Sequence, residues 1–205
     1  DRVKRDIMSQ KFDYPVPVLG FVAYCSNTGK TTLLKQVISL LKQKGVRVGI
    51  VKHCHHEIQI DKPGKDSYEL RKAGAEQAIL ASSNGWALMM EHETPTYPEL
   101  SYLLERMDTA LLDVVLLEGF RQGAVPKVEV SRAELNTPLL CESVENPELA
   151  SSVVALVTDA KELIGGEQKV GTDGLSVLPL NQPEKVVAFI ESWIERYHSF
   201  HQGRE

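Results

Sequence analysis

The sequence predicts an α/β fold, with a mostly parallel sheet flanked by helices, and three observations support this prediction. An apolar run over residues 18–24 precedes a polar loop, after which apolar residues recur at helical spacing over 33–44. A second strand pattern over 46–51 closes a strand–helix–strand unit. Further apolar strands are expected over 111–118 and 153–157. Strands that are apolar on both faces are typical of the centre of a parallel sheet.

The other elements are predicted from local signals. Asp66, with Glu69 three residues later, is typical of a capped helix start. Asn84-Gly85 between two apolar runs is typical of a β-hairpin. Pro183 opens an amphipathic helix near the end of the sequence. In chain order we expect a helix over 68–73 that ends at Gly74, a hairpin over 77–90, a helix after Pro98, a strand over 127–130 and the closing helix.

The polar loop after the first strand has the composition of a phosphate-binding loop. Gly29 lacks a Cβ, so the backbone can curl and direct consecutive N–H groups at one anion, and the following helix adds the positive end of its dipole. Lys30 supplies a positive charge for the β- and γ-phosphates, and the hydroxyl of Thr31 is placed to bind Mg²⁺. Tyr24 stands where the Walker A pattern has its first glycine. The predicted nucleotide-binding segment is Ser26, Asn27, Thr28, Gly29, Lys30, Thr31 and Thr32.

A later strand ends in an acidic residue. Glu118 follows the apolar residues 111–117, so it is expected at the carboxyl edge of the sheet, where ligands of open α/β sheets bind. Nucleotide-binding proteins with such a loop aim a carboxylate from this position at Mg²⁺ or its waters. Thr31 and Glu118 are therefore the predicted metal-binding residues, and Lys30 and Glu118 the predicted catalytic ones. Asp113 begins the strand and is expected at the opposite edge.

These two motifs predict a P-loop NTPase fold with an inserted β-hairpin. We expect residues 1–14 to form a flexible lead-in, because they are polar and end at a proline pair. Residues 15–199 are expected to form a single nucleotide-binding domain.

Composition and charge exclude several classes of protein. The chain has 205 residues and a hydrophobic content of 42%, which is enough for one full core. No stretch approaches the ~18 apolar residues of a membrane span, so no membrane contact is expected. A net charge of -5 without a basic run argues against a nucleic-acid-binding surface. Three unpatterned cysteines suit reduced thiols, and we expect a soluble, cytoplasmic protein.

Two polar clusters are candidates for further contacts. The run His53-Cys54-His55-His56 follows the second strand, and imidazole and thiolate are zinc ligands. Neighbouring residues of a strand point to opposite faces, so polar contacts to nucleotide or partner, a metal site and a structural role all stay open. The charged loop over 61–67 and the helix after it suit either a phosphate-bearing ligand or a solvated surface. The predicted substrate or partner contacts are His53, His55, His56, Asp61, Lys62, Lys65, Asp66 and Arg71.

Asp159 follows the strand over 153–158, where P-loop GTPases often use an aspartate to bind the guanine edge. A turn-capping role for this residue is the competing interpretation. The residues alone therefore do not show whether the protein prefers GTP or ATP. Arg71 and Arg121 are the two arginines expected near the phosphates.

Four segments together resemble a known family. They are GKTTLL at 29–34, VKHCHH at 51–56, DKPGKDSYELRKAGA at 61–75 and LLEGF at 116–120. In this order and spacing they resemble the MobB family of molybdopterin-guanine dinucleotide biosynthesis adaptor proteins, which are P-loop GTP-binding proteins. The resemblance runs from about residue 16 to residue 130, with weaker similarity over 153–159 and in the final helix.

The resemblance implies a GTP-binding protein of molybdenum cofactor maturation, with GTP and Mg²⁺ as cofactors and at most slow GTP hydrolysis. Such a protein would be a homodimer that assists the molybdopterin guanylyltransferase, which joins GMP to molybdopterin, and molybdopterin itself is a further expected partner. Gly29, Lys30, Thr31 and Thr32 fall on the family's phosphate and Mg²⁺ positions, and Glu118 on its strand-end acid.

Two further interpretations come from the residues themselves. The hairpin that carries Trp86, Met89 and Met90 has strand edges that favour pairing with a second subunit. An alternative function is a P-loop small-molecule kinase or ATP-dependent ligase, in which His53 and Lys65 would handle a second substrate together with Asp66.

Overall fold

The computed structural model describes residues 14–54, 58, 61–92, 94, 96–164 and 175–202. The chain divides into two compact units. The sheet unit consists of the residues up to His53 and from Leu100 onward, and the inserted unit is Cys54–Glu99. Residues 1–13 of the expected lead-in lie outside the described residues.

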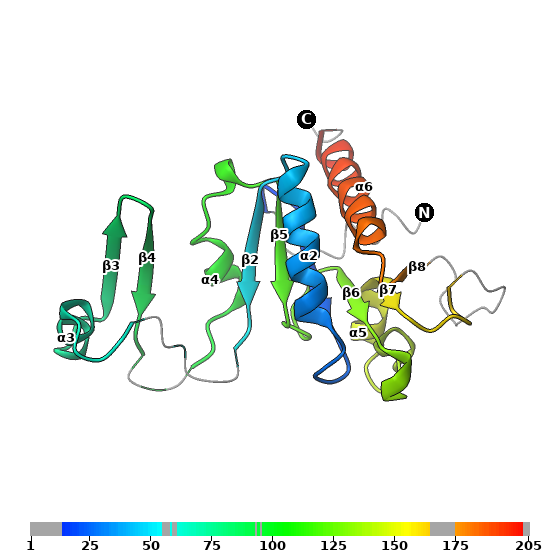
Figure 1. Ribbon diagram of the computed structural model, residues 1–205, viewed down its shortest axis with the longest axis horizontal. Coiled ribbons are helices and arrows are strands. Elements are labelled where there is room, and N and C mark those ends of the chain that lie inside the picture. Colours follow the sequence, from blue (N-terminus) through cyan, green and yellow to red (C-terminus); the bar gives the residue numbers. More distant parts are fainter. Residues whose placement is uncertain are drawn as a thin grey trace. The chain divides into compact units, whose positions relative to one another are not determined.

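The sheet unit is built on a six-stranded sheet in the order β2-β5-β1-β6-β7-β8 (Figure 1). Every neighbouring pair is parallel, so the prediction of a mostly parallel sheet is confirmed. Because β1 lies between β5 and β6, the loops that follow these three strands meet at one edge. The strands are β1 (Val18–Val22), β2 (Val48–Lys52), β5 (Val114–Glu118), β6 (Lys127–Val130), β7 (Val153–Thr158) and β8 (Ser176–Pro179).

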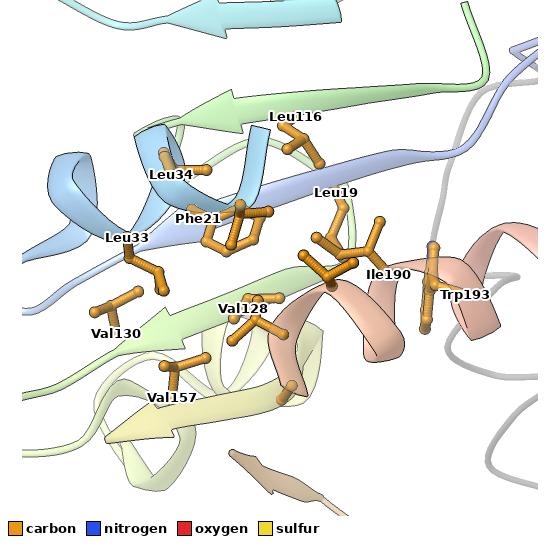
Figure 2. Close-up of a cluster of buried hydrophobic side chains, with 14 of the residues drawn as sticks. Leu19, Phe21, Leu33, Leu34, Leu116, Val128, Val130, Val157, Ile190 and Trp193 are labelled. Carbon is orange, nitrogen blue, oxygen red and sulfur yellow. The ribbon is translucent and has the colours of Figure 1, made fainter. Parts of the chain in front are cut away.

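Two long helices cover one face of this sheet. Leu33, Leu34, Val37 and Leu41 recur at helical spacing along α2 (Lys30–Gln43), and all are buried. The longer α6 (Pro183–Gln202) begins at the proline that the sequence singled out. Its buried residues join those of α2 and the sheet in one core cluster, part of which Figure 2 shows. Members of this cluster include Leu19, Phe21, Leu116, Val128, Val130, Val157, Ile190 and Trp193.

The opposite face of the sheet packs against α4 (Leu100–Leu104) and the residues before β1. Strand alternation separates the two cores: Leu19 joins the α2 and α6 side, whereas Val18 joins this one. Tyr14 belongs to this second core, although it ends the segment expected as a flexible lead-in. Its hydroxyl donates to the Leu104 carbonyl at 2.7 Å, and its own carbonyl accepts from the Tyr197 hydroxyl. The core therefore begins one residue earlier than the polar composition predicts.

The inserted unit contains α3 (Asp66–Lys72) and an antiparallel hairpin of β3 (Gln77–Ser82) and β4 (Gly85–Met90). The predicted hairpin is present, with Ser83-Asn84 as its loop. The predicted cap of α3 is wrong, because Lys65 occupies the cap position and Asp66 is already helical. In place of the expected capping box, the Glu69 carboxylate accepts the N–H of Gly64, two residues before α3, at 3.3 Å.

Several short elements depart from the sequence-based expectation. The strand expected over 111–118 begins at Val114, because Thr109–Leu111 forms a 3₁₀ turn whose Ala110 N–H is capped by the Asp108 side chain. Asp113 does lie at the amino end of β5, paired with Arg47 at 2.7 Å. Four elements were not predicted from the sequence: β8, α5 (Pro147–Ser152) and the 3₁₀ turns Ala133–Leu135 and Leu140–Glu142.

The alternating sequence of β6 suggests one polar face, yet all four of its residues are buried. The Glu129 carboxylate accepts the N–H groups of Leu140 and Cys141 at 2.7 and 2.9 Å. The Lys127 ammonium donates to the carbonyls of Gly123 and Val125 at 2.6 and 2.9 Å, and to the Ser152 hydroxyl at 3.0 Å. Three acceptors match the three N–H groups of an ammonium, so this buried charge is fully hydrogen-bonded.

We expect the unfolding free energy of the native protein to rise between pH 8 and 10.5, relative to that of Lys127→Met. Burial lowers the pKa of Lys127 from 10.5 to about 8. In this window the unfolded chain binds the proton that the folded chain has lost, so stability rises with pH, by ~3 kcal/mol for the full shift. Urea unfolding of both proteins at neutral and alkaline pH measures the difference. A difference that stays constant across this range would contradict the depressed pKa.

Among the described residues, no helix is both long and apolar enough to cross a membrane.

Candidate nucleotide-binding site

The loop between β1 and α2 curls as a phosphate-binding loop requires. Asn27 and Gly29 have φ angles of 65° and 85°, in the left-handed region. Thr28, between them, is buried. Gly29 is the cap residue of α2, and no described side chain caps the first turn. The N–H groups at the start of a 14-residue helix therefore face the loop together with the positive end of the helix dipole.

The two predicted metal-binding residues lie side by side. The Thr31 hydroxyl donates to the Glu118 carboxylate at 2.6 Å. The second oxygen of that carboxylate lies 3.3 Å from the Lys52 ammonium, and Lys52 is paired with Glu118 in the β2–β5 register. A hydroxyl and a carboxylate are the hard oxygen ligands that Mg²⁺ prefers, alongside phosphate and water. These residues therefore fit a magnesium ion, which would replace the hydrogen bond that now joins them.

Lys30 lies half-buried among other charges. Burial lowers the pKa of its ammonium, the Glu118 carboxylate raises it, and the positive charges of Lys52 and Arg121 lower it. Three cations thus surround one carboxylate at this edge of the sheet. Such a surplus of positive charge favours the binding of an anion with several negative charges.

Arg121 and Tyr24 meet at the start of the loop. A guanidinium N–H of Arg121 donates to the Tyr24 carbonyl at 3.2 Å, and its central carbon lies 5.7 Å from the centre of the Tyr24 ring. The sequence placed Arg121 near the site without a partner. In the structure its partner is Tyr24, which replaces the first glycine of the Walker A pattern.

Arg132 is a site residue that the sequence-based reasoning missed. It follows β6, and its guanidinium nitrogen lies 2.9 Å from the position that a Cβ on Gly29 would occupy. The Nε atom of Arg132 is buried and has no hydrogen-bond partner among the described residues. Arg132 lies two residues after β6, which neighbours β1. Knowledge of the strand order would therefore have placed it near the loop.

Asp159 holds the turn that carries Arg132. Its carboxylate accepts the Ala133 N–H at 2.7 Å, while the Ser131 N–H donates to the Val157 carbonyl at 2.9 Å. The turn-capping role left open by the sequence is therefore present. A guanine contact by Asp159 stays a prediction. It would use the second carboxylate oxygen, since the first accepts the Ala133 N–H.

His53 packs under the loop that follows β5. The backbone N–H of His53 donates to the Glu118 carbonyl at 2.9 Å. The centre of its ring lies 5.4 Å from that of the Phe120 ring. His55 and His56 lie outside the described residues, so their predicted contacts stay untested. Within the described part of the chain, His, Cys, Asp and Glu form no cluster of three that would hold a metal ion.

The other predicted contacts belong to the inserted unit. Lys62, Lys65 and Asp66 are exposed there, and Asp61 accepts the backbone N–H of Lys62 at 2.9 Å. Arg71 differs from them, since it pairs with Glu91 and lies over the Tyr68 ring at 5.4 Å. With these contacts Arg71 holds its own unit together.

Comparison with known proteins identifies the family. Residues 18–159 match the family described as molybdopterin guanine dinucleotide synthesis protein B, MobB. The molybdopterin-guanine dinucleotide biosynthesis adapter protein of Escherichia coli K12 is 39% identical over 181 residues, which cover 88% of this chain and 95% of the relative. The adapter protein of the same name from Haemophilus influenzae is 38% identical over 183 residues, or 89% of this chain and 92% of the relative.

A solved structure shows the same fold. The crystal structure of Bacillus subtilis MobB superimposes with a TM-score of 0.60 and 23% sequence identity, over 86% of this chain and 96% of that one. The family match spans more than half of the chain, and both bacterial relatives align over nearly their whole length. The chain therefore belongs to the MobB family of molybdopterin guanine dinucleotide synthesis proteins.

Proposed function

We propose that the protein is a GTP-binding adaptor in the biosynthesis of molybdopterin guanine dinucleotide. The observation that carries this proposal is the Thr31–Glu118 hydrogen bond of 2.6 Å beside Lys30, in a chain of the MobB family. Relatives that align over most of the chain are named as adapter proteins of this biosynthesis.

Each site residue has a role in this proposal. Lys30 and the N–H groups of the loop bind the β- and γ-phosphates, and Thr31 and Glu118 hold Mg²⁺ or its waters. A bound Mg²⁺ ion would supply positive charge that offsets the charge of the phosphates. Asp159 is the proposed guanine contact, through its second carboxylate oxygen. The three cysteines of the sequence show no disulfide pattern and suit the reducing cytoplasm, which is the proposed location of the protein.

The partner in this proposal is the molybdopterin guanylyltransferase, with molybdopterin as a further ligand. Hydrolysis by the adaptor itself would be slow and tied to that partner. A small-molecule kinase or an ATP-dependent ligase is the competing function. The two adapter relatives favour the first proposal, because they align over most of this chain and over nearly their whole length.

The test is a titration of the purified protein with fluorescent GTP and ATP in the presence of Mg²⁺. Phosphate release is then followed with and without molybdopterin and the guanylyltransferase. Binding that favours GTP, with hydrolysis that rises only with the partner, is the expected result. Rapid phosphoryl transfer to a small molecule without a partner would show that the protein is a kinase, and tighter ATP binding would refute the guanine assignment.

We further propose that the hairpin of the inserted unit joins two copies of the chain. Ile79 and Trp86 are 67% and 68% exposed, and the register of β3 and β4 places both on one face. Among the described residues, no third strand pairs with either strand. An open strand edge beside an exposed apolar face is a template for association with a second hairpin.

Trp86→Glu is expected to convert a dimer into a monomer, because it places a charge in the proposed apolar contact. Sedimentation velocity at micromolar concentration measures the change. Leu111→Glu is the matched control, since Leu111 is an exposed leucine of the sheet unit. A native protein that sediments as a monomer, or equal dissociation of both variants, would exclude the hairpin as the interface.

A further inference from the structure

We propose that Tyr24 holds Arg121 over the phosphate loop, where the guanidinium binds the terminal phosphate of a nucleoside triphosphate. This inference rests on the proposed nucleotide binding. It assigns a role to the residue that replaces the first glycine of the Walker A pattern, and to an arginine supplied by the chain itself.

The contacts of Arg121 carry the first step. Its guanidinium is attached to Tyr24 twice, by the hydrogen bond to the carbonyl at 3.2 Å and by the cation–π contact at 5.7 Å. A glycine at position 24 would keep the carbonyl and lose the ring. The ring therefore fixes the direction of a long side chain that would otherwise have many rotamers.

The position of Arg121 carries the second step. It lies three residues after Glu118, at the same strand end, and Glu118 accepts the Thr31 hydroxyl. Thr31 and Glu118 are the residues that would hold Mg²⁺ beside the outer phosphates. Arg121 is therefore on the side of the loop that faces the outer phosphates. Arg132 follows β6, the neighbour of β1 on the opposite side.

The charge of Arg121 is available for a ligand. Among the described residues, no carboxylate forms an ion pair with it, whereas Lys52 is paired with Glu118 and Arg132 with Glu134. The electrostatic effect of Arg121 on Lys30 is that of a nearby like charge. A γ-phosphate between these two cations would relieve their repulsion and give the guanidinium two oxygens to bind.

The expected consequence is discrimination between triphosphate and diphosphate. Fluorescent GTP and GDP are titrated, with Mg²⁺, into the native protein and into Arg121→Gln. We expect Arg121→Gln to weaken GTP binding ~10-fold, the range for a hydrogen bond to a charged group, and to change GDP binding much less. Arg121→Lys keeps the charge without the planar fork, so it should recover only part of the loss.

Tyr24 is tested through the same ratio of GTP to GDP affinity. Tyr24→Ala should lower the ratio of GTP to GDP affinity, as Arg121→Gln does. The conservative Tyr24→Phe should keep the native ratio, because the ring and the carbonyl remain. The double variant Tyr24→Ala/Arg121→Gln should be no worse than Arg121→Gln, because the two residues act as one unit. Arg106→Gln is the matched control, since Arg106 also lies over a tyrosine, Tyr102, at 3.7 Å.

The possible outcomes separate the two proposals. If the native protein binds neither nucleotide, the proposed function fails and this inference fails with it. If the native protein binds GTP but Arg121→Gln leaves the ratio unchanged, or weakens GTP and GDP equally, only the assignment to the terminal phosphate is overturned. Additive losses in the double variant would overturn the positioning role of Tyr24. Circular dichroism confirms that each variant is folded before its affinities are compared.

Discussion

Lys30→Ala is expected to weaken GTP binding at least ~100-fold, the largest functional effect of any single substitution in the site. Lys30 lies half-buried at the start of α2, and burial already lowers the pKa of its ammonium. Because its charge is partly withdrawn from water, an interaction with phosphate is screened less than at the surface. The loop would keep its N–H groups in this variant but lose the ammonium that we propose binds the phosphates.

Lys35→Ala is the matched control for this prediction. Lys35 lies on the same helix and is exposed to solvent, so its loss removes an equal charge without touching the loop. Titration of both variants with fluorescent GTP, with circular dichroism to verify folding, measures the difference. Equal affinities for the two variants would mean that the loop does not bind phosphate in the way we propose.

The elements that the sequence predicts well are those buried on one or both faces. The strand over 127–130 has the predicted boundaries, and α2 and α6 keep their apolar residues at helical spacing. In the two helices burial forces a regular apolar pattern, since each polar side chain on a buried face costs free energy. The helix expected over 33–44 nevertheless begins at Lys30, because the first turn of α2 is built from the polar loop itself.

Segments with weaker patterns were harder to predict. The strand β8 lies at the edge of the sheet and is only half-buried, so its four residues need no strict alternation. The helix α5 is short, although Asn146 caps it through the Leu149 N–H at 3.0 Å and Pro147 begins it, which is a signal that the sequence contains. The helix and strand propensities of such short segments are weak, so tertiary packing decides their structure.

In the candidate site too, some contacts can be predicted from the sequence and others cannot. The pairing of Thr31 with Glu118 follows from two facts in the sequence, a residue at a helix start and an acid at a strand end, which parallel strands bring to one edge. The contacts of Arg121 and Arg132 depend instead on strand order and on the path of the loop. Neither contact leaves a periodic pattern, so no partner for Arg121 can be predicted from the sequence, and Arg132 does not stand out in it.

Ile190→Ala is expected to lower the unfolding free energy by about 2–5 kcal/mol, the range for an isoleucine truncated in a well-packed core. Ile190 lies on α6, has no exposed surface and belongs to the cluster that joins this helix to α2 and the sheet (Figure 2). The loss combines the transfer of the removed carbons with the cavity that the rigid sheet cannot fill. Urea unfolding followed by circular dichroism measures it.

Val144→Ala is the control for this stability change, because Val144 is 92% exposed and its truncation should alter the unfolding free energy by less than ~0.5 kcal/mol. Under conditions where it is folded, Ile190→Ala should bind GTP as the native protein does, since α6 contributes no residue to the phosphate loop or its partners. Lys30→Ala should show the reverse, with stability kept and binding lost. If Ile190→Ala weakened binding while still fully folded, the core beneath α2 would be coupled to the loop, and the site would extend beyond the strand ends.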